Sequence, residues 1–237
     1  MFIILLSSSV FSQTRQSVGL ISKFGIAGGF TPIWVTPNFD PINTKLQNFG
    51  TGKLPEEGMF AAGGSGYAYV MFINNLRIGG MGFSGSVSRD AVVNGYNREI
   101  IYAIGGGGVT VEYTLPMIKG VGLSFGAILG GGSFDIKLHQ NKGDVNWDNI
   151  WNKVNNGDDT KNINTKLTNS YFMVIPTVNL DVPLTRFLAL RVGAGYQYTF
   201  ADEWEIDNER ELKGVPSDLN GNSFFVQTGI FLGFFAF

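Results

Sequence analysis

The amino-acid sequence predicts an all-β protein, an eight-stranded antiparallel up-and-down transmembrane β-barrel with long extracellular loops and short periplasmic turns. Two observations support this prediction. Apolar residues alternate with small or polar residues at a period of two in several segments, as in strands whose two faces meet different surroundings. The connections between these segments alternate between long and short, which is the asymmetry of an up-and-down barrel in an outer membrane.

The composition excludes several other classes of protein. Glycine supplies 33 of the 237 residues, aromatic residues make up 14% and charged residues only 15%. A disordered chain needs the opposite balance of charge and apolar content, and the glycines lack the three-residue period of collagen. The net charge of −2, with no basic cluster, argues against binding to nucleic acid. Without cysteine, the chain forms no disulfide and no usual structural zinc site.

The first residues have the pattern of an export signal. An apolar core at 2–6 is followed by small residues, with Val10 and Ser12 at the positions that precede a cleavage site. The pattern predicts a signal peptide over residues 1–12 and a single barrel domain over residues 13–237. Because no basic residue precedes the apolar core, we interpret the signal as truncated at its start. The alternative interpretation is a buried first strand.

Residues 188–200 show the alternation most clearly. One parity is apolar and includes Tyr196, Tyr198 and Phe200, whereas the other is small or polar and includes Arg191. Small residues are unusual on the wet face of a soluble sheet, but they suit the interior of a narrow barrel, where little volume is available. We therefore expect the apolar side chains to face lipid and the small or polar ones to face the lumen.

Eight strands are expected along the chain. Their approximate ranges are 18–31, 60–74, 76–89, 98–115, 119–138, 168–183, 185–202 and 222–237. An even number of strands puts both termini on the periplasmic side. Because eight strands enclose a space that side chains just fill, we expect no free water pore.

The same alternation assigns Phe83 and Tyr113 to the lipid-facing side, together with Met81, since each alternates with small or polar residues. After the glycines at 130–132, the apolar parity changes and continues from Phe134. Such a change predicts a β-bulge at these glycines.

Three charged residues, Lys23, Glu112 and Arg191, fall on the parity assigned to the lumen. A buried charge must be paired, because an isolated one is very costly to remove from water. The favoured interpretation is a structural salt-bridge network that fills the barrel. The alternative is a gate for small ions or a site for a polar ligand. The sequence indicates no catalytic residue, no metal site and no cofactor.

These features resemble the small eight-stranded outer-membrane β-barrel family, the class that includes the OmpA transmembrane domain and the OmpX and OmpW proteins. The resemblance extends over about residues 18–237 and rests on the export signal, the loop lengths and a terminal strand that ends on an aromatic residue. In this family the barrel-insertion machinery reads such a strand, and Phe231, Phe235 and Phe237 match its pattern. The glycine common upstream is displaced by one position, at Gly233.

The resemblance implies a location in the outer membrane of a Gram-negative bacterium. The implied partners are outer-membrane lipid and lipopolysaccharide, the barrel-insertion machinery and other envelope proteins. The leading expectation for function is a non-enzymatic, structural or accessory subunit of an envelope assembly, with surface loops available for interaction.

Two other functions remain open at this point. The first is a narrow transporter for small apolar molecules, with an apolar lumen near Phe72, Met173 and Ile175 and a lateral exit where Pro176 interrupts a strand. The second is a surface lipid-modifying enzyme centred on His139, the only histidine. A related deacylase has a serine two residues after its histidine, whereas this chain has an asparagine there.

Overall fold

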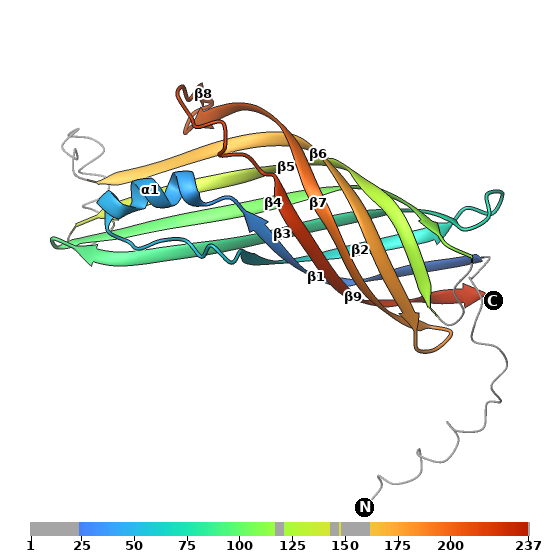
Figure 1. Ribbon diagram of the computed structural model, residues 1–237. Helices are drawn as coiled ribbons and strands as arrows, with labels where there is room; N and C mark the ends of the chain where they lie inside the picture. Colours follow the sequence, from blue (N-terminus) through green and yellow to red (C-terminus); the bar gives the residue numbers. More distant parts are fainter. Residues whose placement is uncertain (1–23, 117–120, 143–146, 148–161, 237) are drawn as a thin grey trace, which may run out of the picture.

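Eight long strands close into one antiparallel barrel in the computed structural model, which describes residues 24–116, 121–142, 147 and 162–236 (Figure 1). The strands are β1 (Phe24–Pro37), β2 (Met59–Tyr69), β3 (Leu76–Val93), β4 (Tyr96–Thr114), β5 (Gly122–Asn141), β6 (Ile163–Pro183), β7 (Leu188–Ile206) and β9 (Ser223–Ala236). A two-residue strand, β8 (Arg210–Glu211), pairs with the end of β7, and one helix, α1 (Asp40–Phe49), follows β1.

The pairing order explains the closure. Each long strand pairs with its neighbours in sequence, and β9 pairs with both β7 and β1, so that no edge of the sheet is left open. This arrangement is the predicted eight-stranded up-and-down barrel. The start of β1 and the end of β9 are paired at Phe24 and Ala236, at the same end as the turns at 70–75 and 184–187. We call this end the short-turn end.

The opposite end, called the long-loop end, carries α1 and β8. Here β3 and β4 extend beyond the ranges expected at 76–89 and 98–115, so the expectation of a loop over residues 90–97 is wrong. Asn94 and Gly95 form a two-residue connection with φ angles of 53° and 77°. Asn-Gly favours such a tight hairpin turn, because both central residues need a positive φ.

The helix α1 is not among the elements expected from the sequence, which gives only a connection between the strands at 18–31 and 60–74. Pro41 lies in its first turn, and Gly50 ends it with a φ of 85° while its N–H donates to the carbonyl of Leu46. Its buried residues include Ile42 and Leu46, which turn toward the barrel interior. No helix in the described part of the chain is long and apolar enough to cross a membrane.

The barrel interior has two chemically different halves. Toward the long-loop end, apolar side chains from the strands and α1 form one cluster, in which the rings of Phe39 and Tyr102 pack edge to face at 4.9 Å. Leu212, Val215 and Leu219, from the connection before β9, pack against the same cluster. Toward the short-turn end, the interior is polar and charged.

The apolar half corrects two predictions. Met81 and Phe83 face the lumen, not lipid, and each is only 6% exposed, with Phe83 packed against Phe225 at 5.8 Å. The predicted bulge at 130–132 is absent, because the β4–β5 and β5–β6 registers run through these glycines without a shift. Phe134 simply faces an apolar part of the lumen and is 1% exposed. The assumption that every apolar residue points outward fails in this half.

Candidate functional site

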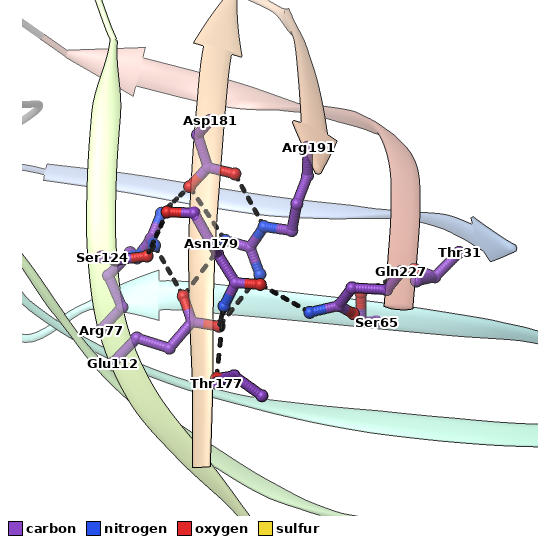
Figure 2. A network of polar contacts seen from close by, with 10 residues as sticks. All are labelled: Thr31, Ser65, Arg77, Glu112, Ser124, Thr177, Asn179, Asp181, Arg191 and Gln227. Carbon is purple, nitrogen blue, oxygen red and sulfur yellow. Dashed lines mark hydrogen bonds and ion pairs between the residues drawn. The ribbon is translucent and has the colours of Figure 1, made fainter. Parts of the chain in front are cut away.

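Two arginines and two carboxylates meet in the polar half of the lumen (Figure 2). Arg77 extends from β3, Glu112 from β4, Asp181 from β6 and Arg191 from β7, and none is more than 7% exposed. We call these four residues the lumen charge cluster. Two positive and two negative charges give the cluster a formal net charge of zero.

Cross-strand pairing places these charges opposite one another. Arg77 is the register partner of Glu112 in the β3–β4 ladder, and Asp181 is the register partner of Arg191 in the β6–β7 ladder. Opposite charges at directly facing positions stabilise a sheet. The two pairs then meet across the lumen, because all four side chains lie on the inward parity.

Each carboxylate contacts both guanidinium groups. Arg77 donates from Nη1 to Asp181 Oδ2 at 2.5 Å and from Nη2 to Glu112 Oε2 at 2.6 Å. Arg191 donates from Nε to Asp181 Oδ1 at 2.7 Å and from Nη1 to Glu112 Oε1 at 3.0 Å. Charge-assisted hydrogen bonds of this kind are among the strongest in proteins, and they offset the cost of removing four charges from water.

Neutral polar side chains extend this network across the barrel. Ser124 accepts a hydrogen bond from Arg77 Nη2 at 2.6 Å, and Asn179 Nδ2 donates to Glu112 Oε1 at 3.2 Å. Gln227 on β9 then donates to Asn179 Oδ1 at 2.7 Å. The network therefore connects strands from β3 to β9 through side chains alone.

Aromatic rings cover the guanidinium groups. The Cζ atom of Arg77 lies 4.5 Å from the ring centroid of Tyr67, and that of Arg191 lies 5.0 Å from the same ring. The Phe231 ring is 4.8 Å from Arg191 Cζ. These are cation–π distances, so each arginine is held by carboxylates and by ring faces together.

Glycines make room for the cluster. A Cβ atom added at Gly126 would lie 2.8 Å from Cγ of Glu112. A Cβ atom added at Gly193 would overlap the Asn179 amide. These two positions explain why small residues occupy the lumen parity beside large polar ones, since the narrow interior leaves them no space.

The structure brings together two of the three lumen charges that the sequence singled out, Glu112 and Arg191. Lys23 lies outside the described residues. Sequence reasoning missed Arg77, because its parity on β3 also carries Met81 and Phe83 and was assigned to lipid. It missed Asp181 as well, because the surrounding segment is apolar on both faces.

The predicted membrane-facing aromatic residues differ in their surroundings. Tyr113, Tyr198 and Phe200 lie on the outer wall and are 44%, 48% and 63% exposed. Tyr196 is half-buried and packs against the Tyr198 ring at 4.7 Å. Phe83, as described above, is inside the barrel.

Of the three residues of the predicted insertion signal, only Phe231 has a described side chain. Phe231 points into the lumen, where it is 1% exposed and covers Arg191. The side chains of Phe235 and Phe237 lie outside the described part of the structure. Recognition of these residues by the insertion machinery stays a prediction.

His139 lies at the rim of the long-loop end, on the outer wall. Its register partners are Glu99 and Asn164, and Glu99 in turn faces Asp90. Asp90, Glu99 and His139 are among the residues that line a shallow hollow of about 300 Å³. This cross-strand row contains no serine, and the described residues contain no group of three or more metal-binding side chains.

The residues named for the transporter hypothesis lie in different surroundings. Met173 and Ile175 are fully buried in the apolar half of the lumen. Phe72, in contrast, lies on the β2–β3 turn and is 87% exposed, so the prediction that it lines the lumen is wrong. Pro176 does not interrupt β6, because its pairing with β5 continues. Toward β7, the ladder skips the two positions Ile175 and Pro176.

No family model matches the chain, and no curated protein sequence is similar to it. Solved structures do match. The chain resembles small outer-membrane β-barrels. The attachment invasion locus protein Ail of Yersinia pestis is 11% identical, and the alignment covers 89% of this chain and 97% of Ail, with a TM-score of 0.46.

Two further barrels give similar values. A major outer membrane protein from Thermus thermophilus is 10% identical over 89% of this chain and 99% of that protein, with a TM-score of 0.46. Neisserial surface protein A is 10% identical over 90% of this chain and 97% of that protein, with a TM-score of 0.38. The strand pairings by themselves establish the closed eight-stranded barrel.

Proposed function

We propose that this chain is a non-enzymatic outer-membrane β-barrel that serves as a structural or accessory component of the cell envelope and presents its long-loop end for interaction. The observation that carries the proposal is the pairing of an apolar outer wall with a buried, charge-neutral network in the lumen. A soluble barrel would not need an apolar outer wall. An open pore could not contain a buried network of charges that crosses the lumen.

The outer wall is apolar over a height that matches a bilayer. On β7, the outward positions from Leu190 to Phe200 are 190, 192, 194, 196, 198 and 200, and four of the larger apolar side chains among them are 38–63% exposed. These ten residue steps at about 3.3 Å, tilted by about 40°, rise by roughly 25 Å. A band of that height is typical of transmembrane barrels.

A polar boundary ends this band toward the long-loop end. Asp135 on β5 pairs with Lys166 on β6 at 3.2 Å, and both lie on the outer wall beyond the apolar positions. On β7, the exposed Asp202 and Glu203 come soon after Phe200, with only Ala201 between them. Charged side chains at this level suit a membrane surface and would be costly within hydrocarbon.

The lumen supports a structural role more than transport. The lumen charge cluster spans the polar half, and buried apolar side chains together with α1 occupy the other half. A transporter needs a continuous apolar tunnel, whereas buried arginines and carboxylates lie across that path. A sealed barrel would present its loops without conducting.

The experiment has two parts. The chain, expressed in a Gram-negative host, should appear in the outer-membrane fraction and migrate faster on a gel before boiling than after it. In planar bilayers it should show no stable conductance. Absence from the membrane fraction, with no heat-dependent shift, would overturn the membrane location, and a steady conductance would overturn the sealed lumen.

A further inference from the structure

The turn between β2 and β3 exposes three consecutive apolar side chains. Met71, Phe72 and Ile73 are 73%, 87% and 50% exposed at the short-turn end. Single exposed apolar residues are common on protein surfaces, but a contiguous group marks a surface that is normally covered. The sequence places these residues in the strand expected at 60–74, whereas β2 ends at Tyr69 and they form the tip of the turn.

Backbone hydrogen bonds hold this tip in place. The N–H of Val70 donates to the carbonyl of Leu76 at 2.9 Å, and the N–H of Ile73 donates to that of Val70 at 3.3 Å. Asn75, with a φ of 65°, accepts a hydrogen bond from the N–H of Thr114 on the neighbouring β4 at 2.9 Å. The turn is thus tied to the barrel rim and cannot easily fold its side chains back onto the wall.

The apolar tip is continuous with the outer wall of the barrel. The outward residues next to it are Ile78, Val111 and Tyr113, which are 45%, 36% and 44% exposed. The charged residues of the same stretch, Arg77 and Glu112, point into the lumen instead. No described charge on the outside therefore separates the tip from the wall that we assign to lipid.

We propose that the β2–β3 turn inserts Met71, Phe72 and Ile73 into the lipid surface of the periplasmic leaflet and anchors the barrel there. This inference rests on the proposed membrane location, because the lipid contact is an extension of the apolar wall. A bilayer interface accepts an apolar tip flanked by amides such as those of Asn74 and Asn75, since its outer zone is polar and its inner zone apolar. The turn thereby adds a lipid contact below the band that the strands supply.

The chain contains no cysteine, so single-cysteine variants need no other change. Phe72→Cys is labelled with a thiol-specific nitroxide in barrels reconstituted into phosphatidylcholine vesicles, and its collisions with oxygen and with a water-soluble nickel chelate are measured. Two matched controls are Ile230→Cys on the outer wall, where the native residue is 56% exposed, and Lys213→Cys in the last loop, where the side chain is 81% exposed. We expect the Phe72→Cys label to favour oxygen several-fold over the Lys213→Cys label.

The controls distinguish the possible failures. If the Phe72→Cys label behaves like the water-exposed loop label while the Ile230→Cys label is in lipid, the anchoring proposal fails and the membrane location stands. If the Ile230→Cys label is also in water, both fail. A Phe72→Cys label shielded from both probes would indicate a protein contact and would also overturn the proposal. Each variant is checked for its heat-dependent gel shift, and Met71→Cys replaces Phe72→Cys if the latter does not fold.

Discussion

Arg77 and Asp181 are 104 residues apart in sequence, yet Arg77 Nη1 lies 2.5 Å from Asp181 Oδ2 inside the barrel. This contact connects the β3–β4 pair of charges to the β6–β7 pair. Only a closed barrel brings these strands face to face, since neither pairs directly with the other. The lumen charge cluster is therefore a tertiary feature that depends on closure.

Removing one member of the cluster should destabilise the barrel. In Arg77→Met, Asp181 and Glu112 share one remaining arginine, and an uncompensated buried charge costs about 3–5 kcal/mol. Unfolding by urea in lipid vesicles, followed by the loss of the heat-dependent gel shift, measures this change. The double variant Arg77→Met with Asp181→Leu restores neutrality. Its loss of unfolding free energy should therefore be smaller than the sum of the losses in the two single variants. Additive losses would show that the two residues are not coupled.

The variant Glu112→Gln separates a structural cluster from an ion gate. Its amide keeps the shape of Glu112 but removes a charge that contacts both arginines, so we expect a loss of stability of about 3 kcal/mol and no conductance. Single-channel recording in planar bilayers and urea unfolding are compared on the same preparation. Unchanged stability together with a new conductance would favour the gating alternative instead.

Glycine at the lumen face should be required where the network needs space. Gly193→Ala places a Cβ atom against the Asn179 amide, and such overpacking costs about 1–3 kcal/mol. Gly80→Ala is the matched control, because an added Cβ there would meet only the Gly108 carbonyl oxygen, at 3.7 Å. The midpoint of urea unfolding should therefore fall for Gly193→Ala and change little for Gly80→Ala. If both variants lower the midpoint equally, the loss in Gly193→Ala would come from the backbone preference of alanine and not from lack of space beside Asn179.

The sequence predicted the barrel because the strand count and the alternation of loop lengths do not depend on which face is apolar. It predicted Glu112 and Arg191 as lumen charges because their strands alternate cleanly. Phe83 and Arg77 share one parity of β3, and because the rule assigned Phe83 to lipid, Arg77 was not predicted as a lumen charge. Hydropathy cannot distinguish a lipid-facing side chain from one in an apolar lumen, since both leave water. Whether such a side chain faces lipid or an apolar part of the lumen depends on its position along the strand. That position becomes known only from the register of the strand pairing.

The helix α1 shows the same limit at the long-loop end. Ile42, Leu46 and Phe49 have a helical spacing, with Pro41 before them and Gly50 after them, which are ordinary signals for the start and end of a helix. An external loop of a barrel does not require a helix, so these signals alone did not predict one. Ile42 and Leu46 of the helix are part of the apolar cluster in the long-loop half of the lumen.

Truncation of Leu46 should test whether α1 is an integral part of the interior. Leu46 is 2% exposed and lies in the apolar cluster, so Leu46→Ala should lower the free energy of unfolding by about 2–5 kcal/mol through lost burial and a residual cavity. Lys45→Ala, at the neighbouring exposed position, should leave it nearly unchanged. Hydrogen exchange of the 40–49 amides, read by mass spectrometry, should speed up in the first variant only. If both variants are as stable as the parent chain and the helix amides exchange fast in all of them, α1 rests on the barrel mouth without contributing to the interior.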